Sequence, residues 1–366
     1  MIKFWNIKYQ SNFFRLYLFC ILYACTPLED EALSDYSAIH DQDLDYSLDM
    51  EVSTFDQDPV DQFISSSSLC DEYEMLPLSY PLTAHILPEA SGLTHSKLHP
   101  HVLWSHNDSG DEAKLVALSN QGEILGELYL KYEAEDLEDI SSSNCPHRSG
   151  YCIWLADTGD NRLSREYLNI LILVEPATGL PFEPFEYRFD DRPSQLWNLP
   201  VILENGPADI EAIAAHQSGN KLWLFEKTEN PLARIWLLDI NTRVIGTYLQ
   251  QLSEESKNPI IAQELITFSA PGIAIEKGKM ITAADLSPAG DRLLLRVYTG
   301  MYEYLFDTPY QLQELSSKEP NLITLGPLSE PQGEALTYGW LGEGLWSISE
   351  SLAEPQDLHY FQCLRD

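Results

Sequence analysis

Basic residues are scarce in this chain. Its 366 residues include 22 Lys and Arg against 57 Asp and Glu, so the formal net charge is −35. A protein that neutralises nucleic-acid phosphates needs the opposite balance, and an acidic surface is repelled by anionic lipid. The composition therefore argues against nucleic acid as a partner and against electrostatic adhesion to a membrane.

Long apolar runs are missing as well. The run at residues 16–24 follows three basic residues and is too short to span a bilayer comfortably. A basic start followed by a short apolar run is typical of an export signal. The signal ends in LYAC (22–25), which resembles the bacterial lipobox. By that resemblance, residues 1–24 are a lipoprotein signal peptide and Cys25 becomes the lipid-modified first residue of the mature chain. A plain secretory signal is the alternative.

Residues 26–70 have no Lys or Arg but many Asp and Glu. Such a segment buries too little apolar surface to offset its chain entropy. We therefore expect residues 25–70 to be an acidic, disordered tether that holds a folded domain, residues 71–366, off a membrane. Since 44% of the chain is hydrophobic, the folded domain has ample material for a core.

Cysteines are few. The signal contains Cys20, and Cys25 would carry lipid, so Cys70, Cys145, Cys152 and Cys363 remain. An even remainder in an exported chain indicates disulfides, for which three connectivities exist. We favour Cys145–Cys152, which closes a small loop, together with Cys70–Cys363, which ties the ends of the domain together.

A helix-period pattern of useful length is also lacking, and short strand motifs recur in its place. The first motif reads EASGLT (89–94), DLEDIS (136–141), DIEAIA (209–214), TAADLS (282–287) and QGEALT (332–337). An apolar strand that usually carries Trp follows each copy: VLWSHNDSGD (102–111), YCIWLADTGDNRLSR (151–165), KLWLFEKTEN (221–230), RLLLRVYTG (292–300) and GLWSISES (344–351). A further strand comes after each pair. Because the Trp residues share one register, we expect them to be packing residues of the repeats, and a platform for sugars is the alternative.

Repeated groups of three or four strands indicate an all-β fold, a β-propeller. Aligned on the apolar fifth position, the first motif has Ser91, Glu138, Glu211, Ala284 and Glu334 in third position. These positions are 47, 73, 73 and 50 residues apart, whereas blades of about 40–50 residues are usual. We interpret residues 176–207 and 253–272 as loops with an extra hairpin. Five blades are favoured and six are the alternative. The last blade lacks an outer strand, which residues 72–88 would supply.

The succession EASGL, HNDSGD, EDIS, ADTGDN, VEP, IEAIA, TAADLSPAGDRLLLRVYTG and EPQGEAL resembles a family of exported bacterial β-propeller proteins. That family is similar in appearance to propellers labelled esterase-like or phytase-like. The likeness covers roughly residues 85–352 and implies the fold; a reaction does not follow from a fold.

Acidic residues at the strand ends would converge in a propeller channel. The candidate cation ligands are Glu138, Asp139, Asp157, Asp160, Glu211, Asp285 and Glu334, with Asp108 and Glu350 nearby. Lys227 and Arg296 are the candidate channel cations. Clustered carboxylates need a compensating cation, and calcium accepts six to eight oxygen ligands. A structural role is favoured over this ligand role: these acids would bond backbone amides and hold turns.

Motifs of known catalytic centres are absent. The chain has no Gly-x-Ser-x-Gly elbow, P-loop or dinucleotide fingerprint. We therefore expect a lipid-anchored module of the bacterial cell envelope that binds a small molecule, glycan or protein at its channel mouth, with calcium as the expected ion. The alternative is a metal-dependent hydrolase of phosphate or carboxylic esters.

Overall fold

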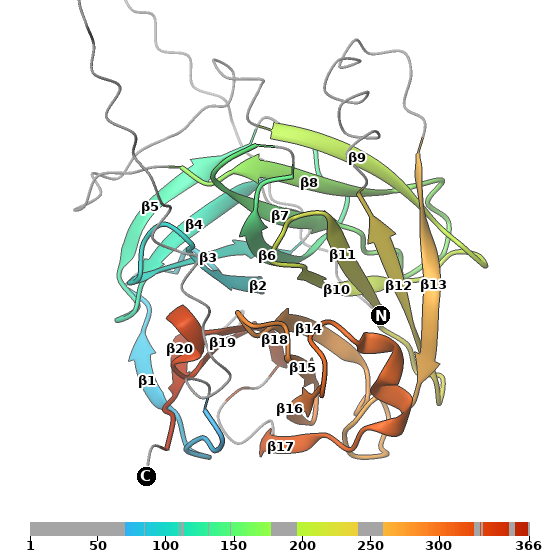
Figure 1. Cartoon of the computed structure of the whole chain (residues 1–366). Coiled ribbons are helices and arrows are strands. Elements are labelled where there is room, and N and C mark those ends of the chain that lie inside the picture. The colour runs from blue at the N-terminus through green and yellow to red at the C-terminus, as the bar shows by residue number, and fades with distance from the viewer. Residues whose placement is uncertain are drawn as a thin grey trace, which may run out of the picture. The chain divides into compact units, whose positions relative to one another are not determined.

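Strands dominate the part of the chain that the computed structural model describes (Figure 1). It describes residues 70–364 except for 84, 109, 111–112, 131, 147, 177–195, 241–258, 326–329, 331 and 351–355. The fold of these residues is all-β, as predicted, with two short 3-10 helices, η4 (Leu312–Ser317) and η5 (Trp340–Gly342). The predicted signal peptide, Cys25 and nearly all of the predicted tether lie outside the described residues.

Consecutive strands pair antiparallel in groups of four, which we call units. The first unit contains β2 (Ala90–His95), β3 (Val102–Asn107), β4 (Lys114–Ser119) and β5 (Ile124–Tyr129). The second contains β6 (Leu137–Asn144), β7 (Tyr151–Asp157), β8 (Leu168–Val174) and β9 (Leu196–Leu203). The third contains β10 (Ile210–Ala215), β11 (Lys221–Glu226), β12 (Ala233–Asp239) and β13 (Ile260–Phe268).

Two further units follow in the same order. The fourth contains β14 (Ile281–Leu286), β15 (Arg292–Val297), β16 (Gly300–Leu305) and β17 (Asn321–Thr324). The last contains β18 (Gln332–Tyr338), β19 (Leu345–Glu350), β20 (Asp357–Phe361) and β1 (Leu78–Pro81). Since β1 comes from the start of the described chain and pairs antiparallel with β20, the sequence correctly predicted where this sheet obtains its outer strand.

The fourth strands of the second and third units correct one prediction. Residues 176–207 and 253–272, expected to be loops with an extra hairpin, contain β9 and β13. Both strands pair antiparallel within their own units, and they also pair parallel with each other at Val201 and Ile260. This parallel contact joins the two units into one sheet of eight strands. Proline misled the prediction, because Pro200 lies inside β9, an outer strand, where a missing N–H is tolerated.

Both predicted disulfides are present. Cys70 pairs with Cys363, and Cys145 pairs with Cys152. Next to the first disulfide, the backbone N–H of Glu74 donates to Gln362 at 2.8 Å. The two ends of the described chain are therefore held together by hydrogen bonds as well as by the covalent bond.

The first strands of the units, β2, β6, β10, β14 and β18, contact one another in a cyclic series. Their hydrogen bonds show that they run in the same direction. Residues near the start of β2 contact residues near the start of β6, and residues further along β2 contact residues further along β6. Ser91 Oγ donates to the Glu138 carbonyl at 2.8 Å, and Thr94 Oγ1 donates to Ser142 at 2.9 Å. Their sequences are rich in Ala, Ser, Gly and Thr, and these small side chains let five strands approach closely.

The apolar core lies between consecutive units. Each of five buried clusters draws on two neighbouring units. Trp104 of the first unit packs in a cluster with residues of the second, and Trp154 of the second packs with residues of the third. Trp346 of the last unit shares a cluster with Leu93 of the first, which completes the series. The recurring Trp residues are thus packing residues, as predicted, and they lie between repeats.

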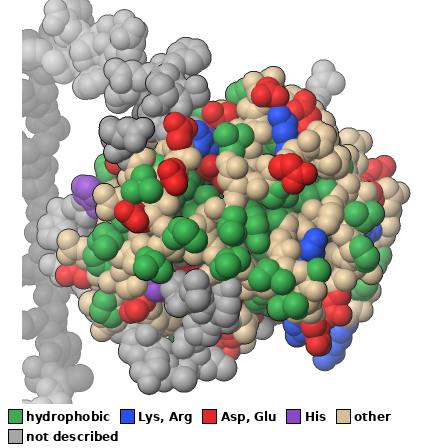
Figure 2. All heavy atoms as spheres, turned by 90° about the horizontal axis from the view of Figure 1, so that it is seen from below, with side chains coloured by type: hydrophobic (Ala, Val, Ile, Leu, Met, Phe, Trp, Pro, Cys, Tyr) green, Lys and Arg blue, Asp and Glu red, His purple; other side chains and the backbone are tan. Residues whose placement is uncertain are grey.

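The surface seen from below carries hydrophobic side chains among scattered acidic and basic ones (Figure 2). Among the described residues drawn in that view, Lys and Arg do not gather into a broad patch. This distribution agrees with the acid excess of the sequence.

Candidate functional site

Each of the five first strands is irregular at the same place, near its start. The register shifts by one residue there, and the unpaired residue is in turn Ser91, Glu138, Glu211, Thr282 and Glu334. All five are buried. A bulge redirects the side chain of its extra residue. The repeat therefore places three carboxylates and two hydroxyls at one end of the group of first strands, which we call the acidic end.

One copy of the repeat was misaligned by the sequence. The apolar fifth position of the fourth copy was assigned to Leu286, which put Ala284 in third position. In the structure the equivalent of Glu138 is Thr282, two residues earlier. Hydrophobicity alone caused the error, since Ala284 takes the place that Leu or Ile holds in the other copies.

Glu138 and Glu211 face each other at the acidic end. Lys227 Nζ lies 2.8 Å from one carboxylate oxygen of Glu211. The other oxygen, Oε1, is buried and accepts from no N–H or hydroxyl group of the described residues, while the Glu138 carboxyl lies within hydrogen-bond reach of Glu211. Burial raises the pKa of Glu211 to about 7, against the opposing charge of Lys227. Burial, and then the charge of Glu211, raise the pKa of Glu138 well above its usual value. Two acids and one lysine leave this centre short of positive charge.

Two more carboxylates approach Glu138. One oxygen each of Asp108, Asp136 and Glu138 lie within 4.8 Å of one another. Gly159 sits against this group, and a Cβ atom there would overlap the carboxylates of Asp136 and Glu138. Gly159 of the DTGDN segment is thus explained by close approach, since its φ is not positive. Carboxylate oxygens at this spacing suit a hard cation such as Ca²⁺.

Asp157 and Asp160 support the loops around this group. Asp157 accepts hydrogen bonds from the Asp136 backbone at 2.9 Å, from the Tyr132 hydroxyl at 2.6 Å and from Arg165 at 3.0 Å. Asp160 accepts from the backbone N–H groups of Ser164 and Arg165 at 2.8 and 3.1 Å. These donors give both carboxylates a positioning role in the loops near Asp136.

Asp139 and Asp285 join neighbouring first strands. Asp139 Oδ2 accepts the Ile213 N–H of β10 at 2.8 Å, and Asp285 Oδ2 accepts the Tyr338 N–H of β18 at 2.9 Å. Burial raises the pKa of each carboxyl. These contacts are of the structural kind that was favoured from the sequence for these acids.

The remaining predicted residues divide between two surroundings. Glu334 lies at the acidic end and accepts from the Tyr298 hydroxyl at 2.9 Å. Glu350 lies nearby, and burial together with Glu334 raises its pKa to about 7. Lys227 lies over the Tyr298 ring, 5.7 Å from its centroid, and connects Glu334 to Glu211. Arg296 instead forms a buried ion pair with Glu330.

Sequence reasoning missed Asp136 and Glu330 as partners. Asp136 opens the DLEDIS motif, so its place just before a first strand was the available signal. Glu330 offered no local signal, because its partner Arg296 is 34 residues away. Among the described residues, no helix is long and apolar enough to cross a bilayer. Comparison of the chain with protein-family models and with curated proteins finds no match.

Proposed function

We propose that the five units are the blades of a β-propeller, and that β1 closes the ring by completing the last blade. Three observations support this proposal: the cyclic contacts of the first strands, their common direction, and five core clusters that each bridge neighbouring units. A ring of small antiparallel sheets protects its edges in this way.

We further propose that the propeller is a binding module that holds a divalent cation, calcium, at Asp108, Asp136 and Glu138. The observation that carries this proposal is the approach of three carboxylates to within 4.8 Å, beside a buried Glu211 oxygen that accepts from no described N–H or hydroxyl group. A cation would compensate the repulsion that otherwise holds protons on such acids. Asp157 would then position the backbone at Asp136. Gly159 would leave room for the carboxylates of Asp136 and Glu138.

Calcium titration followed by thermal unfolding tests the site. At a free concentration 100 times its dissociation constant, calcium should stabilise the folded protein by about 2.7 kcal/mol. The Asp108→Asn, Glu138→Gln double variant should lose this response, because it keeps side-chain size but removes two charges. Glu123→Gln, an exposed change in the turn before β5, serves as the matched control and should respond like wild type. A wild-type melting temperature that ignores calcium, magnesium and manganese alike would remove the cation from the proposal.

Hydrolysis of phosphate or carboxylic esters is the second candidate. It is favoured by the same geometry, since a cation held by few protein ligands keeps positions open for water and substrate. Turnover of generic esters that depends on both the cation and Glu138 would support a hydrolase. Cation binding without turnover would leave the binding module.

Attachment to the cell envelope through Cys25 completes the proposal. Its support is the position of Cys25 after a basic and apolar start. We expect the wild-type chain to enter the detergent phase and Cys25→Ser to remain in water. If both variants partition into water, the chain is not lipid-anchored.

A further inference from the structure

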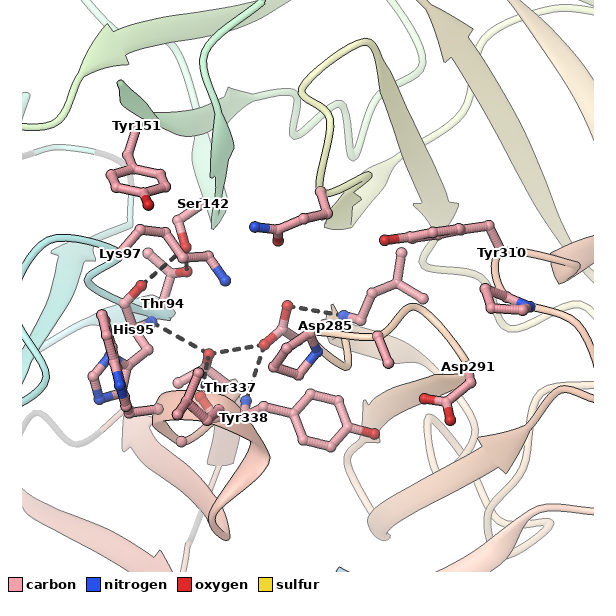
Figure 3. A pocket seen from close by; sticks show the side chains of 18 of the residues that line it. Thr94, His95, Lys97, Ser142, Tyr151, Asp285, Asp291, Tyr310, Thr337 and Tyr338 are labelled. Atoms are coloured by element: carbon pink, nitrogen blue, oxygen red, sulfur yellow. Dashed lines mark hydrogen bonds between the residues drawn. The ribbon is translucent and has the colours of Figure 1, made fainter. Parts of the chain in front are cut away.

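A second site lies at the opposite end of the first strands. There, a cavity of about 740 Å³ opens among residues that end β2, β14 and β18 (Figure 3). Its volume is in the range of small-molecule sites. Thr94, Lys97, Asp285 and Thr337 supply polar groups to its wall, and Tyr310 and Trp340 supply aromatic ones.

Lys97 extends into this cavity, as Figure 3 shows. No described residue accepts a hydrogen bond from its ammonium group or pairs with it within 4.0 Å, although the charges of Asp285 and Glu175 act on it. Both of those carboxylates have other donors. Glu175 accepts from Trp104 Nε1 at 3.0 Å and from the Lys97 backbone at 3.1 Å. The Lys97 side chain is half-buried, and this burial lowers its pKa against the opposing charges of Asp285 and Glu175.

Asp285 holds its position through three donors and still faces the cavity. Thr337 Oγ1 donates to it at 2.8 Å, and the backbone N–H groups of Leu286 and Tyr338 donate at 2.8 and 2.9 Å. Each carboxylate oxygen has two lone pairs, so Oδ1, which accepts only from Leu286 among the described donors, can accept another bond. The cavity thus offers a fixed acceptor, Asp285, and a donor of opposite charge, the Lys97 ammonium, that has no hydrogen-bond partner among the described residues.

Two lining residues have left-handed backbone conformations. Tyr310 and Leu341 have φ values of 64° and 59°. Such a conformation costs free energy in residues other than glycine and is often retained at binding sites. Tyr310 is also stacked against His216, with ring centroids 3.8 Å apart, so its ring is held in place.

We propose that this cavity binds a neutral sugar ring, with Lys97 donating to one hydroxyl and Asp285 accepting from a neighbouring one. An anion would meet the carboxylates of Asp285 and Asp291, which line the cavity, and a cation would meet Lys97. Two adjacent hydroxyls of a sugar can bond to Lys97 and Asp285 without bringing a further charge into the cavity. The C–H face of the sugar ring can pack on the aromatic ring of Trp340 or Tyr310. This inference rests on the proposed binding role and names its ligand class, but it does not need the cation.

Saturation-transfer NMR with single sugars tests the site, in buffer with excess chelator so that the acidic end stays out of the result. The probes are glucose, galactose, N-acetylglucosamine and maltose, with glucuronate and alanine as charged and zwitterionic comparisons. We expect at least one neutral sugar to bind wild type, and Lys97→Met to weaken its Kd at least tenfold. Lys279→Met changes a half-buried lysine outside the cavity, whose ammonium donates to Ser269 at 3.3 Å, and this variant should bind like wild type.

Three outcomes would overturn the proposal. They are no binding of any neutral sugar, unchanged binding by Lys97→Met, and binding of glucuronate or alanine alone. If Lys97→Met does not fold, Trp340→Leu replaces it, since this half-exposed residue can lose its ring with less damage. Calcium binding that persists while sugar binding fails would sink this inference and leave the proposed cation site intact.

Discussion

Adjacent residues at the start of β6 have opposite roles. The bulge in β6 leaves Glu138 unpaired and directs it toward Asp108, Asp136 and Glu211. Asp139, the next residue, is regularly paired and accepts backbone N–H groups of Ile140 and Ile213. Burial raises the pKa of both carboxyls. The kind of partner therefore separates a ligand candidate from a structural acid here, whereas acidity and burial do not.

A buried histidine gives a pH prediction at the same scale. His106 is fully buried, and a side chain on Gly92 would overlap its ring. Burial lowers the pKa of His106 to about 4 from an ordinary value of 6.5. Because the unfolded chain then binds the proton more tightly, the stability due to neutral His106 is present above pH 6.5. It is lost as the pH falls toward 4, by up to about 3 kcal/mol.

Urea unfolding of wild type and His106→Gln between pH 4.5 and 7.5 measures this contribution. The variant should be less stable than wild type at pH 7.5, and the difference should shrink as the pH falls. Buried acids contribute with the opposite sign, but they are common to both proteins and cancel in the comparison. Two pH profiles that run parallel would show that His106 does not titrate in this way.

At the scale of elements, the order of most strands could be predicted from the sequence, because short strand motifs recur along the chain and each can be recognised from its own residues. The second and third strands of each unit are short runs of apolar, β-branched or aromatic residues, such as LNILILV in β8, and these were recognised. The fourth strands β9 and β13 were not, since Pro200 and the polar residues of β13 resemble loop sequence. β13 is only partly buried, so its hydrophobic pattern is weak, whereas β9 is mostly apolar and buried and was obscured by Pro200.

The candidate sites were less predictable than the strands. Glu138 and Glu211 could be found because both occupy one position of a repeated motif. Lys97 could not be found, because the residue after β2 is not part of the repeated motif. Its candidate role depends on Asp285, which lies 188 residues later in the chain. Register was the other limit: the misplaced fourth copy hid Thr282, and only the pairing of β14 with β15 reveals it. Long-range pairing is set by tertiary packing, which no local pattern encodes.

The ends of the described chain meet at the scale of the whole domain. Besides the Cys70–Cys363 disulfide, Leu364 donates to the Glu72 carbonyl at 2.8 Å, and Arg292 lies 3.3 Å from Glu303 beneath this contact. The Tyr73 and Tyr338 hydroxyls donate to the same glutamate at 3.2 and 2.8 Å. A buried hydrogen-bonded network thus fastens the N-terminal segment to the last two units.

The long disulfide should therefore contribute more to stability than the short one. In the chain-entropy model, closing a loop of 293 residues stabilises the fold by roughly 6 kcal/mol at most, against roughly 2 kcal/mol for the 7-residue separation of Cys145 and Cys152. We expect Cys70→Ala, Cys363→Ala to lower the free energy of unfolding more than Cys145→Ala, Cys152→Ala does, as measured by urea unfolding without reductant. The short-loop variant is the matched control, because each variant removes two sulfur atoms, with both cysteines of the short loop buried. The first variant should also expose Tyr73 to solvent, which its fluorescence or hydrogen exchange near β20 would report. Equal losses in the two variants would mean that the hydrogen-bonded network around Glu303, rather than the covalent bond, holds the ends of the domain together.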